Sequence, residues 1–351
     1  MLIREASLRK EEFDSPVKTV FIGGGTPSLL TPEQLIRMVH GLEESVDMSD
    51  CREFTVEANP GTLTKAFLET AAGLGINRLS LGMQAKQESL LKRLGRIHTF
   101  RDVCQSVELA RKLNFENLNL DLIFGIPGQT IEEWAETLDA AIALRPTHIS
   151  AYGLIPEKET PLFERLQKHE MELPDQEVER SMYDIALEKL AENGFKQYEI
   201  SNFAVKGYEC AHNIGYWTQV PYVGLGLSAA SMHIVEQTKK GMKCMRRTNP
   251  DKMDDYYRMI REKNTTLYQI EEIGSDEARF ETMMLALRMN CGISRERFNE
   301  LHGIPIESCY GSELDEMQRS GLMQFKDGSW MLTRRGMDVQ NSILVEFMKD
   351  L

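Results

Sequence analysis

The chain of 351 residues contains few cysteines, and they lie far apart. No two of them are spaced closely enough to form a CxxC pair. This scatter excludes a disulfide framework and, by itself, a zinc or iron–sulfur motif. We therefore expect isolated, reduced thiols in cores and on helices. The six cysteines are Cys51, Cys104, Cys210, Cys244, Cys291 and Cys309.

Long apolar runs and an excess of basic residues are also missing. No run approaches the ~18 residues that a membrane span needs. The N-terminal MLIREASLRKEEF lacks the apolar core of a signal peptide, so we expect a cytoplasmic protein. The 41 Lys and Arg are outnumbered by 54 Asp and Glu, which gives a net charge of −13. This charge argues against nucleic-acid binding but leaves room for a small anionic ligand held by one arginine.

Strand and helix patterns alternate from about residue 17 to about residue 155. Short, largely apolar segments predict buried parallel strands, and capping boxes at Thr31 and Thr130 predict helix starts between them. Repeated strand–helix units predict a parallel βα sheet or barrel, in which ligands bind at the carboxyl ends of the strands. The predicted strands are 17–24, 53–58, 78–84, 117–125 and 148–154.

The remainder of the chain has a different rhythm. Residues 156–205 are mainly helical, 206–235 are rich in glycine and aromatic residues, and 236–275 are expected to be a connecting segment with one helix. Residues 276–351 predict three helices and a hairpin with an Asp-Gly turn, a winged-helix-like pattern. Its 9 Lys and Arg against 13 Asp and Glu favour a packing or protein-contact role over DNA binding. The predicted domains are 1–205, 206–275 and 276–351.

Polar residues stand at or near the ends of the predicted strands. The first strand ends in a glycine run, which either brings bare backbone N–H groups close to a ligand or simply makes a tight turn. A polar side chain inside an apolar strand is costly unless it is paired or bound to something. A set of carboxylates, an amide and an arginine at one barrel mouth suits a zwitterionic, sugar-bearing ligand. The candidates are Gly24, Gly25, Glu57, Gln84, Arg96 and Asp121.

The motifs GGGTPS, VEANP, SLGMQ, LGRIH and NLDLIFGIPGQT, in this order, resemble the radical S-adenosylmethionine proteins of the oxygen-independent coproporphyrinogen III oxidase-like family. The resemblance implies a partial (β/α)6 barrel, an α/β fold, plus a winged-helix-like α+β module. It also implies that Gly24 and Gly25 lie against the methionine portion of S-adenosylmethionine and that Arg96 holds its carboxylate. The resemblance further implies that Gln84 and Asp121 bind the ribose hydroxyls and that Glu57 makes a further polar contact. The backbone at Ile155 would face the adenine.

The family that this sequence resembles carries a CxxxCxxC loop whose thiolates hold a [4Fe–4S] cluster, and this sequence does not contain that loop. We expect the first barrel strand to be missing as well, which would leave the strand at 17–24 with an open edge. Without cluster ligands, the polypeptide should not cleave S-adenosylmethionine reductively. We hypothesise that the natural product starts further upstream. Met1 would then be a misassigned start or an artificial boundary, which the upstream gene sequence would decide.

The segment HNIGYW at 212–217 matches the HNxxYW motif of the HemW-type heme chaperones within that family. By itself, His212 could be an ordinary buried histidine. In the family context it is a candidate axial ligand for heme iron, because a neutral imidazole nitrogen binds iron well. Asn213 could orient the imidazole, and Tyr216 and Trp217 could cover a porphyrin face or fix the loop. Cys210 is a less favoured accessory ligand.

Three functional hypotheses follow. The first is a chaperone that binds heme at His212 and delivers it to acceptor proteins, including membrane respiratory proteins. The second is an oxygen-independent coproporphyrinogen III dehydrogenase, which would oxidatively decarboxylate propionate side chains through a 5′-deoxyadenosyl radical. The third is a cluster-less remnant that uses the barrel only as a binding scaffold. HNIGYW favours the first.

Overall fold

The computed structural model describes residues 1–238 and 241–348. The chain folds into two compact units, which are described separately. The first unit comprises residues 1–17, 40–50 and 211–351, and the second comprises residues 18–39 and 51–210. The N-terminal residues thus belong with the C-terminal part of the chain. The three-domain division 1–205, 206–275 and 276–351 stays a prediction.

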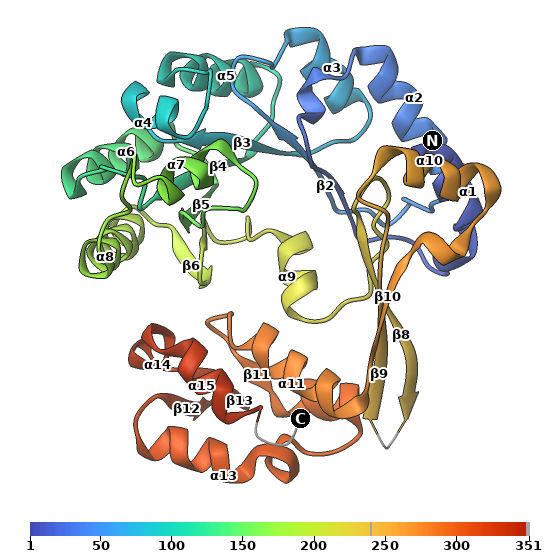
Figure 1. The fold of residues 1–351 in the computed structure, drawn as a ribbon, viewed down its shortest axis with the longest axis vertical. Helices are drawn as coiled ribbons and strands as arrows, with labels where there is room; N and C mark the ends of the chain where they lie inside the picture. The colour runs from blue at the N-terminus through green and yellow to red at the C-terminus, as the bar shows by residue number, and fades with distance from the viewer. Residues whose placement is uncertain (239–240, 349–351) are drawn as a thin grey trace. The chain divides into compact units, whose positions relative to one another are not determined.

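The second unit is built on a seven-stranded sheet (Figure 1). Strands β1 to β5 run parallel in sequence order, and β7 and β6 extend the sheet as antiparallel neighbours. The strands are β1 Thr19–Ile22, β2 Glu53–Ala58, β3 Arg78–Gln84, β4 Asn117–Phe124, β5 His148–Gly153, β6 Lys196–Glu199 and β7 Asn202–Ala204. The predicted α/β architecture of a partial βα barrel is confirmed.

Helices connect these strands. Capping boxes at Thr99 and Thr130 fix the starts of α5 and α6, since each threonine side chain and the acidic residue three positions on satisfy one another's backbone N–H. The helices are α2 Pro32–Glu43, α3 Lys65–Gly73, α4 Glu88–Arg93, α5 Phe100–Lys112, α6 Ile131–Ala143, α7 Pro161–Gln167 and α8 Gln176–Glu192, with the short 3₁₀ turn η2 Pro27–Leu29. From His40 onward, α2 belongs to the first unit.

The two faces of the sheet differ in polarity. Leu79, Leu81 and Leu120 are fully buried with other aliphatic side chains on one face. Alternate residues point to the opposite face, where Ser80 and Asn119 are buried polar groups. The expectation of largely apolar strands therefore holds for one face only. The polar face supplies the functional site described below.

The first unit contains a three-stranded antiparallel sheet in the order β10-β9-β8. These strands are Gln269–Ile273, Gly241–Thr248 and Ala230–Thr238. The prediction of a connecting segment missed β9 and β10, because the strands carry many charged and polar residues on their exposed positions. Other elements of this unit are α1 Leu2–Leu8, η1 Lys10–Glu12, α9 Ala211–Trp217, α10 Met253–Glu262 and η3 Thr265–Leu267.

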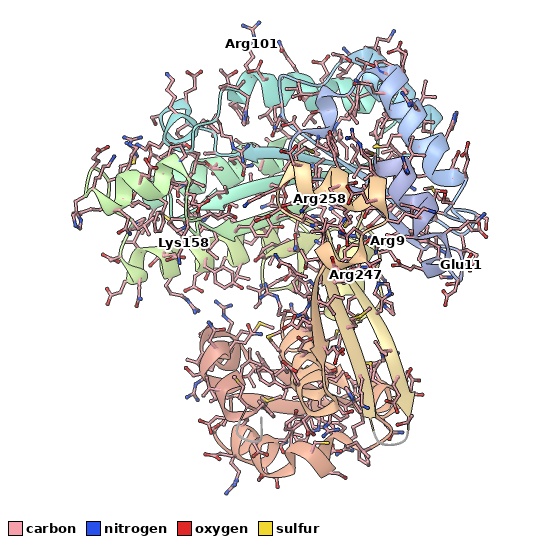
Figure 2. The ribbon with its side chains drawn as sticks, turned by 45° about the vertical axis from the view of Figure 1, so that its right-hand side comes forward. Arg9, Glu11, Arg101, Lys158, Arg247 and Arg258 are labelled. Atoms are coloured by element: carbon pink, nitrogen blue, oxygen red, sulfur yellow. The ribbon has the colours of Figure 1, made fainter. Side chains whose placement is uncertain are left out.

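A buried charge cluster ties α1 and η1 to this sheet. Arg9 is only 4% exposed, and its guanidinium donates to Glu5 at 3.1 Å and to Glu12 at 2.9 Å. Arg247 of β9 also donates to Glu12, at 2.6 Å. Figure 2 shows Arg9 and Arg247 close together. Because buried ions are stable only when paired, this cluster fixes the N-terminal helix within the unit.

The C-terminal part of the first unit follows the predicted order of helices and hairpin. Asp327 and Gly328 form the hairpin turn with φ values of 51° and 81°, as a type I′ turn requires. The elements are α11 Ser275–Ala286, β11 Ile293–Ser294, α12 Arg295–His302, α13 Ile306–Arg319, β12 Met323–Lys326, β13 Ser329–Leu332, α14 Arg334–Asp338 and α15 Gln340–Glu346. Together they enclose an apolar core around Phe298, Leu314 and Trp330. The predicted winged-helix-like module is confirmed, with two further helices after the hairpin.

Candidate functional site

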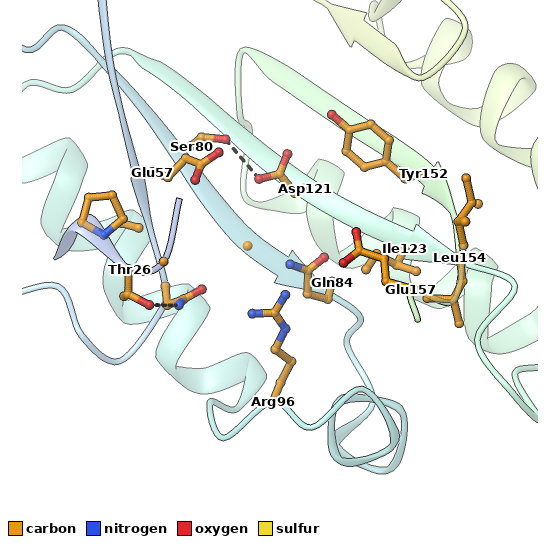
Figure 3. Close-up of a pocket in the computed structure, with 17 residues that line it drawn as sticks. Thr26, Glu57, Ser80, Gln84, Arg96, Asp121, Ile123, Tyr152, Leu154 and Glu157 are labelled. Carbon is orange, nitrogen blue, oxygen red and sulfur yellow. Dashed lines mark hydrogen bonds between the residues drawn. The ribbon is translucent and has the colours of Figure 1, made fainter. Parts of the chain in front are cut away.

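A cavity of about 590 Å³ opens at the carboxyl ends of the parallel strands (Figure 3). Six predicted residues from different strands and loops line it together: Gly25, Glu57, Gln84, Arg96, Asp121 and Ile155. The predicted meeting of these side chains in one place is therefore an observed feature of the fold. Their assignment to parts of a nucleotide stays a prediction.

The glycine run after β1 is shaped around Glu57. The N–H of Gly24 donates to Glu57 Oε2 at 3.1 Å. A Cβ on Gly23 would lie 3.0 Å from the same oxygen, so a larger residue would push the carboxyl group aside. Gly24 and Gly25 have φ values of 77° and 57°, which glycine adopts without strain. Burial raises the pKa of the Glu57 carboxyl, the Gly24 hydrogen bond opposes the rise, and the nearby Asp121 carboxylate adds to it.

Gln84 ends β3 in a strained backbone conformation. Its φ is 63°, unusual for a residue with a side chain, and the pairing of β3 with β4 shifts register between Gly82 and Gln84. A Cβ on Gly82 would lie 2.8 Å from Gln84 Nε2, so glycine leaves the space into which the amide folds. A strained backbone of this kind persists only where surrounding contacts enforce it, and such residues cluster at functional sites. Here it turns the Gln84 side chain into the cavity.

Asp121 presents its carboxyl group from the middle of β4. Ser80 Oγ donates to Oδ2 at 3.0 Å, and Asn119 Nδ2 donates to Oδ1 at 2.8 Å. Burial raises the pKa of the Asp121 carboxyl, and hydrogen bonds from Asn119, Ser150 and Ser80 oppose that rise. The carboxyl group is thus held in place by donors and remains free to accept from a ligand hydroxyl.

Arg96 enters the cavity from the loop after α4. Its backbone N–H donates to the carbonyl of Leu91 at 2.9 Å, and Gly95 before it has a φ of 71°, which together close the end of α4. Figure 3 shows the Arg96 guanidinium directed toward Gln84. Arg96 is the cation that the prediction required at this site.

Sequence reasoning missed several residues that line the cavity. Asn59 lies within the motif VEANP and donates to Thr26 Oγ1 at 3.1 Å, so the motif itself was an available signal. Tyr152 continues the alternation of His148 and Ser150 along β5, which would have identified it, whereas Glu157 lies in the loop after β5 and carries no such signal. Burial raises the pKa of the Tyr152 phenol, and Asp121 adds to the rise, so this phenol stays protonated. The missed lining residues are Thr26, Pro27, Ala58, Asn59, Ser80, Gly82, Ile123, Tyr152, Gly153, Leu154 and Glu157.

The predicted heme segment forms α9 in the first unit. His212 Nε2 lies 3.0 Å from the hydroxyl of Tyr216, one helical turn later, and the two rings meet edge-on at 4.9 Å. Tyr216 in turn meets Tyr222 edge-on at 4.7 Å. The imidazole is therefore oriented by Tyr216. The predicted orienting role of Asn213 stays a prediction.

Trp217 belongs to a different environment from Tyr216. The Arg288 guanidinium lies 4.6 Å from the centre of its ring, so one indole face is occupied by the C-terminal end of the α11 region. Arg297 also donates to the backbone carbonyl of Thr218 at 3.3 Å. Of the two roles predicted for Trp217, these contacts favour fixing the segment.

The cysteines do not form a metal site. Within residues 1–238 and 241–348, no three histidine, cysteine or acidic side chains come together as metal ligands. Cys210 is fully buried, and its thiol donates to Glu53 Oε1 at 3.4 Å. It thus packs against the sheet, which argues against the accessory-ligand role considered for it.

Comparisons with known proteins agree with these features. A family model described as the radical SAM superfamily matches residues 2–141, and one described as the HemN C-terminal domain matches residues 274–339. The heme chaperone HemW of Bacillus subtilis is 36% identical over 336 residues, 95% of this chain and 86% of the relative. This chain belongs to the HemW family. HemW of Escherichia coli is 31% identical, over 95% of this chain and 85% of its own length.

A solved structure shares the fold of the HemW family member described here. Coproporphyrinogen III oxidase (HemN) from Escherichia coli, a radical SAM enzyme, matches with a TM-score of 0.80 at 21% identity, covering 100% of this chain and 82% of its own. The resemblance inferred from the short motifs is thereby confirmed. In the part of the chain that the structure describes, no helix has both the length and the apolarity to cross a bilayer.

Proposed function

We propose that this protein binds heme at His212 and passes it to acceptor proteins, as a heme chaperone. The observation that carries the proposal is the pairing of His212 with Tyr216 on α9, inside the HNxxYW pattern. The HemW relatives, which are named heme chaperones, support it. A neutral imidazole is a good axial ligand for heme iron, and aromatic rings suit a flat porphyrin. The acceptors include membrane respiratory proteins, reached from the cytoplasm.

In this proposal the residues of the heme segment, 212–217, have different roles. His212 binds the iron, and Tyr216 holds the imidazole until iron replaces the hydroxyl at Nε2. Trp217, with Arg288 across its ring, keeps α9 attached to the C-terminal helices. Asn213 is the candidate for the hydrogen bond that sets the imidazole tautomer in the loaded state.

We further propose that the cavity binds S-adenosylmethionine, whose sulfonium is open to reductive cleavage when an iron–sulfur cluster accompanies it. The lining carries more carboxyl groups than cations, with Glu57, Asp121 and Glu157 against Arg96. The ligand has the complementary balance, a sulfonium and an ammonium against one carboxylate. Arg96 would grip the carboxylate, Gln84 and Asp121 would accept from ribose hydroxyls, and Gly24, Gly25, Glu57 and Ile155 would complete the cradle.

The residues present do not fit a [4Fe–4S] cluster. Such a cluster needs cysteine thiolates at close spacing, and the six cysteines of this sequence are scattered. Cys210, the cysteine nearest His212 in sequence, is committed to Glu53. We therefore assign no reaction step to a cluster held by these residues.

An optical titration tests the proposal. Hemin added to the purified protein should shift the Soret band and saturate, and His212→Ala should abolish the shift. His40→Ala is the matched control, since His40 lies exposed on α2. Equal binding by His212→Ala would remove His212 from the account. Measurable turnover of coproporphyrinogen III by the protein would favour the dehydrogenase hypothesis instead.

A further inference from the structure

A chain of hydrogen bonds runs across the polar face of the sheet away from the cavity. It starts at Asp121, which lines the cavity, and continues to Asn119 two residues earlier on β4. Asn119 Oδ1 lies 2.6 Å from His148 Nδ1 on the neighbouring strand β5. His148 Nε2 lies 2.9 Å from the hydroxyl of Tyr198, which accepts from the backbone N–H of Cys210 at 3.3 Å.

The acceptor at Asp121 fixes the direction of every bond in this chain. A carboxylate only accepts, so the Asn119 atom beside it is the amide Nδ2, which also reaches Ser80 Oγ at 2.7 Å. Asn119 therefore turns its oxygen to His148, whose Nδ1 must carry the proton. Burial, together with the nearby Arg78 cation, lowers the pKa of His148 well below its usual range. The ring is thus neutral, and its bare Nε2 accepts from Tyr198.

At the far end of the chain of hydrogen bonds, both the backbone and the side chain of Cys210 donate to groups of the sheet. Its N–H donates to Tyr198, and its thiol donates to the Glu53 carboxyl on β2. Cys210 is the last residue of the second unit, and His212 follows it by two positions in the sequence. Hydrogen bonds that all point the same way polarise one another, so a change at one end alters the bonds further along.

We propose that His148 and Tyr198 are positioning residues that transmit the state of Asp121 in the cavity to the backbone of Cys210, and thereby to the segment that carries His212. A ligand hydroxyl that donates to Asp121 draws on the negative charge of the same carboxylate and so weakens the hydrogen bond from Asn119. The weakened bond loosens Tyr198 and then the Cys210 N–H. In its link to heme this inference rests on the proposed function, whereas the hydrogen-bond relay itself does not.

Amide hydrogen exchange at Cys210 tests the relay without heme. Asp121→Asn should speed exchange on the order of threefold, because it replaces a charge-assisted hydrogen bond by a neutral one about half as strong. Tyr198→Phe should speed exchange too, and adding Asp121→Asn to it should change nothing further, since the relay is already cut. Tyr183→Phe is the matched control, because its hydroxyl donates to Ile200 instead. An unchanged Cys210 amide in Asp121→Asn, or full additivity in the double variant, overturns the relay.

A second readout needs no variant that could fail to fold. Nitrogen-15 NMR of the histidine-labelled protein should show His148 with its proton on Nδ1 from pH 6 to 8, whereas a proton on Nε2 overturns the inference. His148→Gln, which also offers a donor and an acceptor, should restore slow Cys210 exchange relative to His148→Phe. Hemin affinity tests the proposed function separately. If the protein does not bind hemin, the chaperone function is wrong, whereas the relay is still tested by amide exchange at Cys210.

Discussion

The hydroxyl of Tyr216 lies 3.0 Å from Nε2 of His212, on the nitrogen that would bind heme iron. The two groups compete for one position, because a coordinated nitrogen cannot also exchange a hydrogen bond with the phenol. If His212 binds heme as proposed, its Nε2 is covered by the Tyr216 hydroxyl in the heme-free protein. In the proposed function, heme loading would require the Tyr216 phenol, which we call the cap, to move away from Nε2, and heme release would let it return.

Removal of the cap should strengthen heme binding. In Tyr216→Phe, we expect hemin affinity to rise roughly threefold to tenfold, the range that one net hydrogen bond supports. Absorption titration in the Soret band measures it. Tyr222→Phe keeps the cap and packs against the same ring, so it should bind hemin as the unaltered protein does. Weaker binding by Tyr216→Phe would mean that the phenol supports the bound heme directly.

Gly82 should control nucleotide affinity through Gln84. In Gly82→Ala, the new Cβ would lie 2.8 Å from Gln84 Nε2, the mobile end of a long side chain, so the amide moves and the sheet remains folded. We expect binding of S-adenosylhomocysteine, measured by calorimetry, to weaken about tenfold, as loss of one ligand hydrogen bond implies. Gly73→Ala, at the end of α3 with open space around it, is the control and should bind normally. Normal affinity in Gly82→Ala would remove Gln84 from the site.

The buried cation Arg9 should dominate the stability of its unit. Arg9→Met leaves the buried Glu5 without its cation and removes one of the arginines paired with Glu12, so we expect a loss of about 3–5 kcal/mol in the free energy of unfolding. Hydrogen exchange in β8 and β9 under denaturant measures it. Lys112→Met breaks an exposed pair with Glu108 and should cost below about 1 kcal/mol. Similar losses in both variants would contradict the account of the buried cluster.

His302 should make the C-terminal module sensitive to acid. Burial, with the nearby cations Arg279 and Arg297, lowers the pKa of His302 from 6.5 to about 4. Below pH 6.5 the unfolded chain binds a proton that the folded chain refuses, so this contribution to stability falls between pH 6.5 and 4 and is constant outside that window. The slope should reach at most about 1.4 kcal/mol per pH unit.

The comparison with His302→Gln isolates that contribution. Equilibrium unfolding of both proteins at several pH values should show a steeper acid loss in the unaltered protein. His302 Nε2 lies 2.8 Å from Thr282 Oγ1, and Gln can occupy the same space with a polar end. Parallel curves for the two proteins would show that His302 does not titrate between these limits.

Local signals in the sequence were enough for much of the fold. The capping box at Thr130 and the Asp327-Gly328 turn each determine their backbone by short-range chemistry, and both are found where predicted. Glu57, Gln84 and Asp121 were found because a polar residue in an apolar strand is costly unless it is paired or bound to a ligand, whereas Ile155 came from the family resemblance alone. The meeting of Glu57 and Asp121 then follows from parallel strands that end at one edge.

Other features depend on partners that are distant in the sequence. The sequence of β9 has the composition of a polar loop. Its strand conformation depends on pairing with β8 and β10 and on α11, which covers one side. Asn119, His148 and Tyr198 looked unremarkable because their roles arise only when β4, β5, β7 and β6 assemble in this order in one sheet. Cys210 was a possible ligand in sequence, whereas its contact with Glu53 lies 157 residues away along the chain.

Identification of the ligand to ferric heme tests the central claim most directly. Electron paramagnetic resonance of the hemin-loaded protein, prepared with natural and with nitrogen-15 histidine, should reveal an imidazole bound to iron. We expect this signature to disappear in His212→Ala and to survive in His40→Ala, whose change lies on the exposed surface of α2. An imidazole-ligated heme that persists in His212→Ala would contradict the account.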